Sequence, residues 1–234
     1  MKQKLFTLLV ISLFLSCTWK KNKNAFIEAL CIVGSSPVYE MPEMTSQVIA
    51  SFHLGEQVKI MNRAKSKRRT NSQLVEIQAT DGTAAWTLYE NLLTNAVPAA
   101  ILEDAVIYQH PEMNTQTDKK FHLAEFAAVT DQNESWVRIM GAGKKKEGWI
   151  PRECITTHPG DVNVAILAHS DLLDRNGVII TDKLADFLKH LPDNNAELAI
   201  KLQQLMDQEV ADAIEQSIME YEQEVYNEDI DIED

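Results

Sequence analysis

The sequence predicts a β + α fold, in which two tandem small β-barrels are followed by a C-terminal α-helical module. Two observations carry this prediction. First, a stretch at residues 38–55 returns downstream, and Tyr39, Pro42 and Phe52 each have an identical residue 69 positions later. A constant separation of this kind indicates a duplicated folding unit. Second, the spacing of apolar residues changes from two to about 3.6 after Gly160, which indicates helices.

Each copy contains short runs in which apolar and polar residues alternate. In the first copy, Val58 and Ile60 alternate with polar neighbours, as expected for an antiparallel strand with one buried face. About five such runs per copy, with a turn between each pair, are typical of a small barrel. We assign the first copy to residues 27–95 and the second copy to residues 96–157.

The second copy has a motif order that resembles the bacterial SH3 domain. The residues that carry the resemblance are Leu123, Glu125, Trp136, Val137, Ile139, Gly148, Trp149, Ile150 and Pro151. The first copy keeps Trp86 but has Ala85 where glycine is expected, and Thr87-Leu88 where Ile-Pro is expected. The resemblance implies two tandem SH3-like β-barrels that bind ligands, with the second copy the more complete of the two.

The N-terminus predicts export. Lys2 and Lys4 precede a mostly apolar run at 5–15, which is the pattern of a cleaved signal peptide and is too short to span a membrane. We assign residues 1–16 to the signal peptide and residues 17–26 to a lipidated tether.

Cys17 is the predicted lipidation site. Phe14-Leu15-Ser16-Cys17 resembles the lipobox of bacterial lipoproteins, in which the cysteine carries palmitate and other acyl chains, although Phe14 stands where leucine is usual. The alternative is an ordinary cysteine beside a simple secretory cleavage site. Thr18 is not the aspartate that often retains lipoproteins at the inner membrane. We therefore expect a lipid-anchored envelope protein of the outer membrane, on its periplasmic face or at the cell surface.

The charge is negative and uneven. The formal net charge is −13, and the residues from Gly160 onward hold 19 acids against four bases. A protein of this charge is not expected to bind nucleic acid. Two loops are rich in lysine or arginine, at Lys65–Arg69 and Lys144–Lys146. We expect them to be solvent-exposed loop tips, and the alternative is that they contact an anionic partner.

The helical module is assigned to residues 160–226. A first helix is expected to end near Gly177, and a second is expected over 182–191. Asn194 and Glu197 form a capping-box pattern at the start of a third helix with one apolar face. The acidic residues 227–234 are expected to form a disordered tail.

Catalysis is not predicted. A cysteine peptidase needs a thiol activated by a histidine, and the local pair Cys154 and His158 at the end of a β-unit is a poor candidate. A calcium loop counted from Gly177 fails at its first and last ligand positions. No cofactor and no metal site are predicted, and whether Cys31 and Cys154 form a disulfide is left open.

Five aromatic side chains are candidates for ligand binding, with burial in the barrel cores as the alternative. They are Tyr39, Trp86, Tyr108, Trp136 and Trp149. The predicted function is non-catalytic binding of peptidoglycan or of an envelope protein through the SH3-like barrels, at a membrane reached by the lipid anchor. The alternative function is assembly of an envelope complex through the amphipathic C-terminal helices. The oligomeric state is left open.

Overall fold

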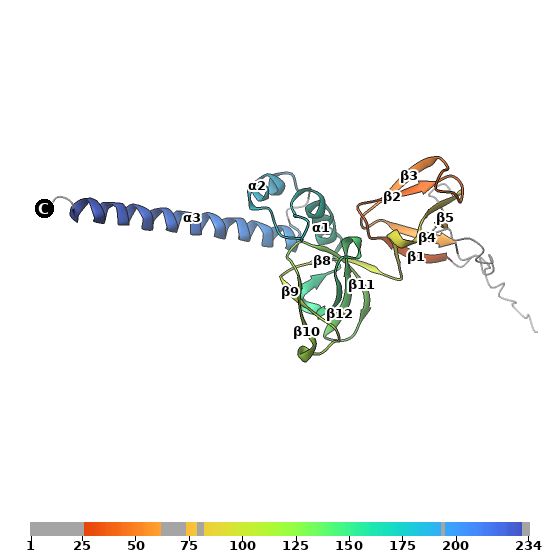
Figure 1. Ribbon diagram of the computed structural model, residues 1–234, viewed down its shortest axis with the longest axis horizontal. Coiled ribbons are helices and arrows are strands. Elements are labelled where there is room, and N and C mark those ends of the chain that lie inside the picture. The colour runs from red at the N-terminus through yellow and green to blue at the C-terminus, as the bar shows by residue number, and fades with distance from the viewer. Residues whose placement is uncertain (1–25, 62–73, 79–81, 193–194, 231–234) are drawn as a thin grey trace, which may run out of the picture.

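The computed structural model describes residues 26–61, 74–78, 82–192 and 195–230, with side chains as far as Tyr221. It contains two antiparallel sheets of seven strands each and three C-terminal helices (Figure 1). The β + α class predicted from the sequence is confirmed.

The first sheet has the strand order β3-β2-β6-β5-β4-β1-β7. Its strands are β1 (Phe26–Cys31), β2 (Ser35–Tyr39), β3 (Val48–His53), β4 (Gln57–Met61), β5 (Leu74–Gln78), β6 (Ala84–Leu88) and β7 (Leu92–Thr94). A short 3₁₀ turn at Tyr89–Asn91 connects β6 to β7.

The second sheet has the strand order β10-β9-β13-β12-β11-β8-β14, which is the first order shifted by seven strands. Its strands are β8 (Val97–Ile101), β9 (Ala105–Tyr108), β10 (Gln116–Phe121), β11 (Phe126–Gln132), β12 (Trp136–Gly141), β13 (Glu147–Pro151) and β14 (Ile155–Thr156). The duplicated sequence therefore folds into two sheets with the same strand order.

Neither sheet is closed. Across the described residues, β3 does not pair with β7, and β10 does not pair with β14, so the closure expected of a barrel is not seen in the strand pairing. Each sheet nevertheless has a core of its own. In the second sheet, Ile101, Ile107, Phe121 and Ile139 come from four different strands and share one buried cluster. The sheet therefore curls around its inner face.

The three helices are α1 (Pro159–Asp171), α2 (Thr181–Lys189) and α3 (Glu197–Ile230). The first helix ends six residues before Gly177, earlier than the sequence indicated. The carboxylate of Asp174 accepts the backbone N–H groups of Asn176 (2.8 Å) and Val178 (2.9 Å), and Gly177 has a φ of 86°. These contacts form a turn instead of a further helical turn.

The third helix continues past residue 227, where a disordered tail was expected, and reaches Ile230. Its expected cap Asn194 lies outside the described residues. The backbone N–H of Leu198 instead donates to the buried carboxylate of Asp161 in α1 (2.8 Å). An acidic side chain is favourable at this position because the N-terminal end of a helix carries partial positive charge.

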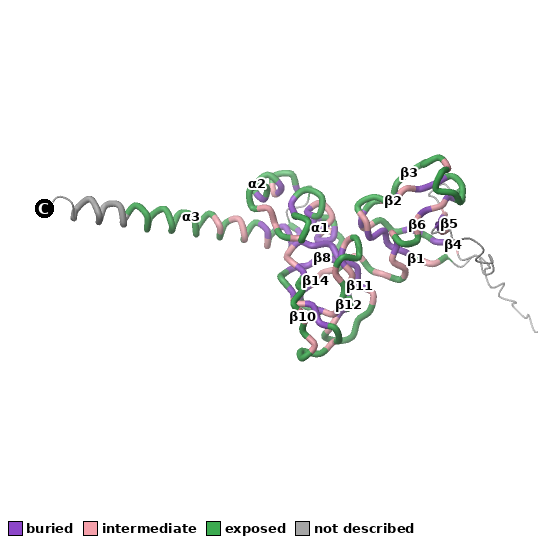
Figure 2. Tube along the Cα trace, viewed as in Figure 1, coloured by how far each residue is buried: buried purple, intermediate pink, exposed green. Residues whose placement is uncertain are grey.

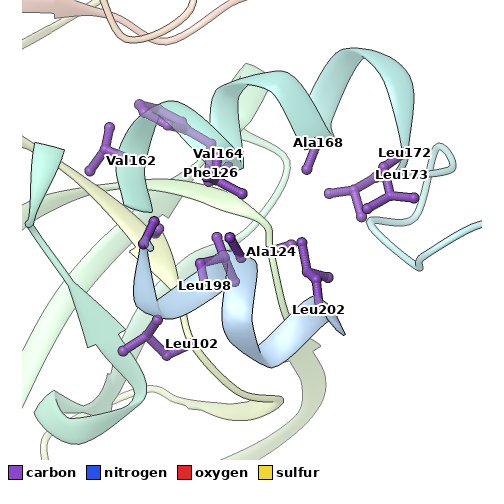
Figure 3. Close-up of a cluster of buried hydrophobic side chains, with 14 of the residues drawn as sticks. Leu102, Ala124, Phe126, Val162, Val164, Ala168, Leu172, Leu173, Leu198 and Leu202 are labelled. Atoms are coloured by element: carbon purple, nitrogen blue, oxygen red, sulfur yellow. The ribbon is translucent and has the colours of Figure 1, made fainter. Parts of the chain in front are cut away.

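A shared core joins both repeats to the helices. Figure 3 shows side chains of the second sheet, such as Phe126, meeting Val162 of α1 and Leu198 of α3. Leu30 of β1 and Ile32 directly after it belong to the same buried cluster. The helices therefore cover the outer face of the second sheet at β8 and β11, and they also contact the first repeat.

The two cysteines after Cys17 do not pair. Cys31 and Cys154 are both free and buried, and each belongs to the core of a different repeat. This answers the question that the sequence left open.

Candidate functional site

Three of the predicted ligand-binding residues gather on the second sheet. We call Tyr108 of β9, Trp136 of β12 and Trp149 of β13 the aromatic surface. Tyr108 and Trp136 make an edge-to-face contact, with ring centroids 5.0 Å apart and an angle of 77° between the planes. Tyr108 and Trp149 are directly opposite on neighbouring strands.

The strand register places the two tryptophans on the outer face of the sheet. Trp136 lies opposite Pro151, and Arg138 lies opposite Trp149. Val137, which alternates with these residues, is almost wholly buried in the core of the sheet. Because successive side chains point to opposite faces, both tryptophans point outward. Each is only partly buried, whereas Tyr108 is buried.

An ion pair borders the aromatic surface. Arg138 and Glu147 form a hydrogen-bonded pair whose side chains are 47% and 42% exposed. The surface therefore offers two partly exposed rings beside one charge of each sign. A combination of aromatic planes and a few fixed polar groups is suited to binding a sugar or a peptide segment.

The first repeat has a reduced version of this surface. Tyr39 lies opposite Trp86, as Tyr108 lies opposite Trp149. Leu74 lies opposite Leu88, in the place that Trp136 takes in the second repeat. Tyr39 is buried, and Trp86 is partly buried. The five candidate residues thus form two separate groups, and only the second group has three rings.

A cavity of about 240 Å³ lies where the second sheet meets the connection between α1 and α2. Lys146 pairs with Glu125 on one side and donates to the backbone carbonyl of Asn176 (2.9 Å) on the other. Its ammonium group also lies 5.5 Å from the centroid of the Phe121 ring. Lys146 therefore ties the turn after α1 to the sheet.

Burial shifts the pKa values of two side chains that line this cavity. Burial raises the pKa of Glu125, and the ion pair with Lys146 opposes the rise. Burial, together with the charge of Lys145, lowers the pKa of His169. The residues of the described chain that line the cavity include no cysteine, serine or threonine. This arrangement fits a structural clamp better than a nucleophilic site.

The sequence indicated Glu125 only as part of a family motif, and Lys146 only as part of a lysine run. Glu56 occupies the equivalent place of Glu125 in the first copy. The presence of an acidic residue at this position in both copies, next to repeated apolar residues, is the one signal that could have identified Glu125 as a structural residue. The sequence offered no signal for its pairing with Lys146, since that depends on the fold of the second sheet.

Cys154 is not an activated nucleophile. Burial and the neighbouring Glu103, which accepts a hydrogen bond from the thiol (3.3 Å), raise the pKa of Cys154 to about 12. The thiol is therefore protonated at neutral pH. In the part of the chain that the structure describes, no three histidine, cysteine or acidic side chains are grouped as metal ligands.

Cys17, the predicted lipidation site, lies outside the described residues, as do the signal peptide and nearly all of the tether. None of the described helices combines the length and the apolar character needed to cross a membrane.

No family model and no curated protein matches the chain. Among solved structures, NlpC2 from Trichomonas vaginalis matches with 14% sequence identity and a TM-score of 0.26, over 71% of this chain and 56% of its own. NlpC1 from the same organism matches with 12% identity and a TM-score of 0.26, over 72% of this chain and 54% of its own. The chain thus spans just over half the length of these proteins. Similarity at this level does not bear on fold or function.

Proposed function

We propose that this protein is a non-catalytic binding protein of the cell envelope, anchored by lipid on Cys17, whose second SH3-like repeat binds peptidoglycan or a segment of an envelope protein. The aromatic surface carries this proposal. The shared strand order of the two sheets supports the same fold for both repeats. In the closing segment Gly148–Pro151, the second repeat keeps the glycine and the Ile-Pro pair, whereas the first repeat keeps only the tryptophan, Trp86.

The aromatic surface has the physical properties of a binding site. Trp136 is held by its edge contact with Tyr108, and Trp149 is held in the middle of a strand paired on both sides. Rings that are fixed before binding lose little conformational entropy when a ligand covers them. Their exposed faces contribute apolar area and stacking in the complex.

Co-sedimentation with isolated peptidoglycan sacculi tests the cell-wall ligand. The mature chain with Cys17→Ser should pellet with sacculi at moderate salt and stay in solution without them. If it stays in solution with sacculi, the cell-wall part of the proposal is wrong.

Mass spectrometry of the mature N-terminus tests the anchor. An acylated Cys17 at the first position is expected. An unmodified terminus at Cys17 or Thr18 would remove the anchor and the outer-membrane location from the proposal.

A second candidate function is assembly of an envelope complex through the helical module. It is favoured by α3, which projects away from the rest of the molecule and is exposed from Val210 to Tyr221 (Figure 2). Truncation after Thr157 should then remove the protein partners, and partners that stay bound to the truncated chain would exclude this candidate.

A further inference from the structure

The outer part of α3 has no contact with the body of the protein among the described residues. Leu198 and Leu202 are fully buried in the shared core, and Thr181 of α2 still donates to Glu209 (3.4 Å). Every described side chain from Val210 to Tyr221 is exposed. At about 1.5 Å per residue, the helix from Val210 to Ile230 extends roughly 30 Å beyond these contacts.

This projecting part has one apolar face. Val210, Ile214, Ile218 and Tyr221 are spaced by four, four and three residues, which places them on one side of a helix. They are 54%, 54%, 52% and 67% exposed. We call these four residues the apolar stripe.

The opposite side of the helix is mainly polar and internally hydrogen-bonded, with the exposed Met219 as its large apolar residue. Gln208 donates to Asp212 (2.6 Å), and Gln216 donates to Glu220 (2.9 Å). A helix in water gains most of its stability by packing an apolar face. The stripe is therefore the side on which a partner would stabilise α3.

Charge decides which partner fits. Residues 207–234 contain 12 acids and no lysine or arginine. Two copies of α3 side by side would bring like charges together along their length, and an anionic membrane surface would repel the same charges. A helix with an apolar face flanked by lysine or arginine would match both the stripe and the acids beside it.

We propose that the apolar stripe of α3 binds a basic amphipathic helix of a partner protein. The inference rests on the second candidate function and specifies the chemistry of its partner. It does not involve the aromatic surface, so the two sites can be tested separately.

The test uses the mature chain with Cys17→Ser and a fluorescent helical peptide of roughly 20 leucine and lysine residues, with leucines at i, i+3, i+4 and i+7. A scrambled peptide of the same composition has no apolar face and measures attraction by charge alone. Fluorescence anisotropy at physiological salt should show at least tenfold tighter binding of the amphipathic peptide.

The variant Ile214→Ser with Ile218→Ser removes the centre of the stripe. It should weaken binding of the amphipathic peptide by roughly tenfold to hundredfold, since each buried side chain contributes strongly to apolar binding. The matched control, Gln208→Ser with Gln216→Ser, lies on the opposite side and should bind within about twofold of the parent chain. Circular dichroism verifies that both variants remain helical.

Four results would overturn the inference. They are equal binding of the scrambled peptide, unchanged binding by the stripe variant, a dimer in sedimentation that the stripe variant dissociates, and binding to anionic lipid vesicles that the stripe variant abolishes. The second candidate function fails separately, when truncation after Thr157 leaves the protein partners bound. Trp149→Ala should leave peptide binding unchanged, which distinguishes this site from the aromatic surface.

Discussion

Three equivalent positions in or beside the core are polar in the first repeat and apolar in the second. They are Ser36, Thr87 and Asn91 in the first repeat, and Ala105, Ile150 and Cys154 in the second. The polar residues form a chain of hydrogen bonds. Asn91 donates to Ser36 (3.0 Å), Ser36 and Thr87 share a bond of 3.0 Å, and Thr87 donates to the carbonyl of Pro37 (2.8 Å). One strand order is thus compatible with two kinds of core, provided that each buried polar group has a partner.

A second difference lies on the outer face. Gln57 and Lys59 of β4 are exposed, whereas their counterparts Phe126 and Ala128 in β11 are buried beneath the helices. The second repeat is therefore packed on both faces at β8 and β11, and its aromatic surface occupies the same face further along, at β9, β12 and β13. The second repeat therefore has both the contact with the helices and the aromatic surface.

The largest effect is expected from Phe126→Ala. Phe126 is 1% exposed and joins the second sheet to α1 and α3, so the substitution should lower the free energy of unfolding by about 3–5 kcal/mol. The equivalent change Gln57→Ala in the first repeat should have an effect within about 0.5 kcal/mol. Urea unfolding of both variants measures the difference. Equal losses would contradict the view that the helices cover only the second sheet at this position.

Thr87→Val tests the polar core of the first repeat. Valine keeps the shape of threonine but leaves the carbonyl of Pro37 without its donor, which should cost about 1–3 kcal/mol of the free energy of unfolding. Ile150→Val at the equivalent position removes one methylene and should cost about 0.5–1.5 kcal/mol. Thermal or urea unfolding compares the two. If Thr87→Val is neutral, the hydrogen-bond chain does not stabilise this core.

Glu125→Gln should change the pH dependence of stability. Burial raises the pKa of Glu125 above its ordinary value near 4.5, so the folded chain holds this proton more tightly than the unfolded chain does. The resulting stabilisation is complete below the unfolded pKa and is lost as the pH rises through the folded pKa. Glutamine has no ionisable carboxyl, so the stability of the variant does not fall as the pH rises through this pKa. The stability of the variant relative to the wild type should therefore be greater at roughly pH 7 than at roughly pH 4.

Urea unfolding at both pH values measures this change, and Glu134→Gln on the exposed surface of the same repeat is the control. A relative stability that is the same at both pH values for Glu125→Gln would mean that the buried carboxyl does not contribute as described.

Much of the β-region could be predicted from alternation alone. Val58 and Ile60 are buried in β4, as their pattern indicated. The alternation is readable there because one face of β4 meets solvent. In β11, four successive buried residues from Phe126 to Val129 obscure the pattern, because the helices cover the second face. The sequence therefore predicted the strand but not the layer above it.

The candidate sites were predictable to different degrees. Trp136 and Trp149 were named from the motif, and Tyr108 from the repeated stretch, but only the strand register places both tryptophans on the outer face. The contacts of Asp161 with Leu198, and of Lys146 with Glu125 and Asn176, join residues far apart in the chain. Such contacts depend on how α1 and α3 pack on the sheet, and local sequence patterns do not encode this packing directly.

The most direct test of the account is the comparison of Trp149→Ala with Trp86→Ala in binding to isolated peptidoglycan sacculi. Both variants are made in the mature chain with Cys17→Ser, and circular dichroism verifies their folding. Trp149→Ala should weaken binding by at least about tenfold, as expected for a central aromatic contact. Trp86→Ala should stay within about twofold of the parent chain. Equal losses in both variants, or a loss only in Trp86→Ala, would contradict the claim that the second repeat is the ligand-binding one.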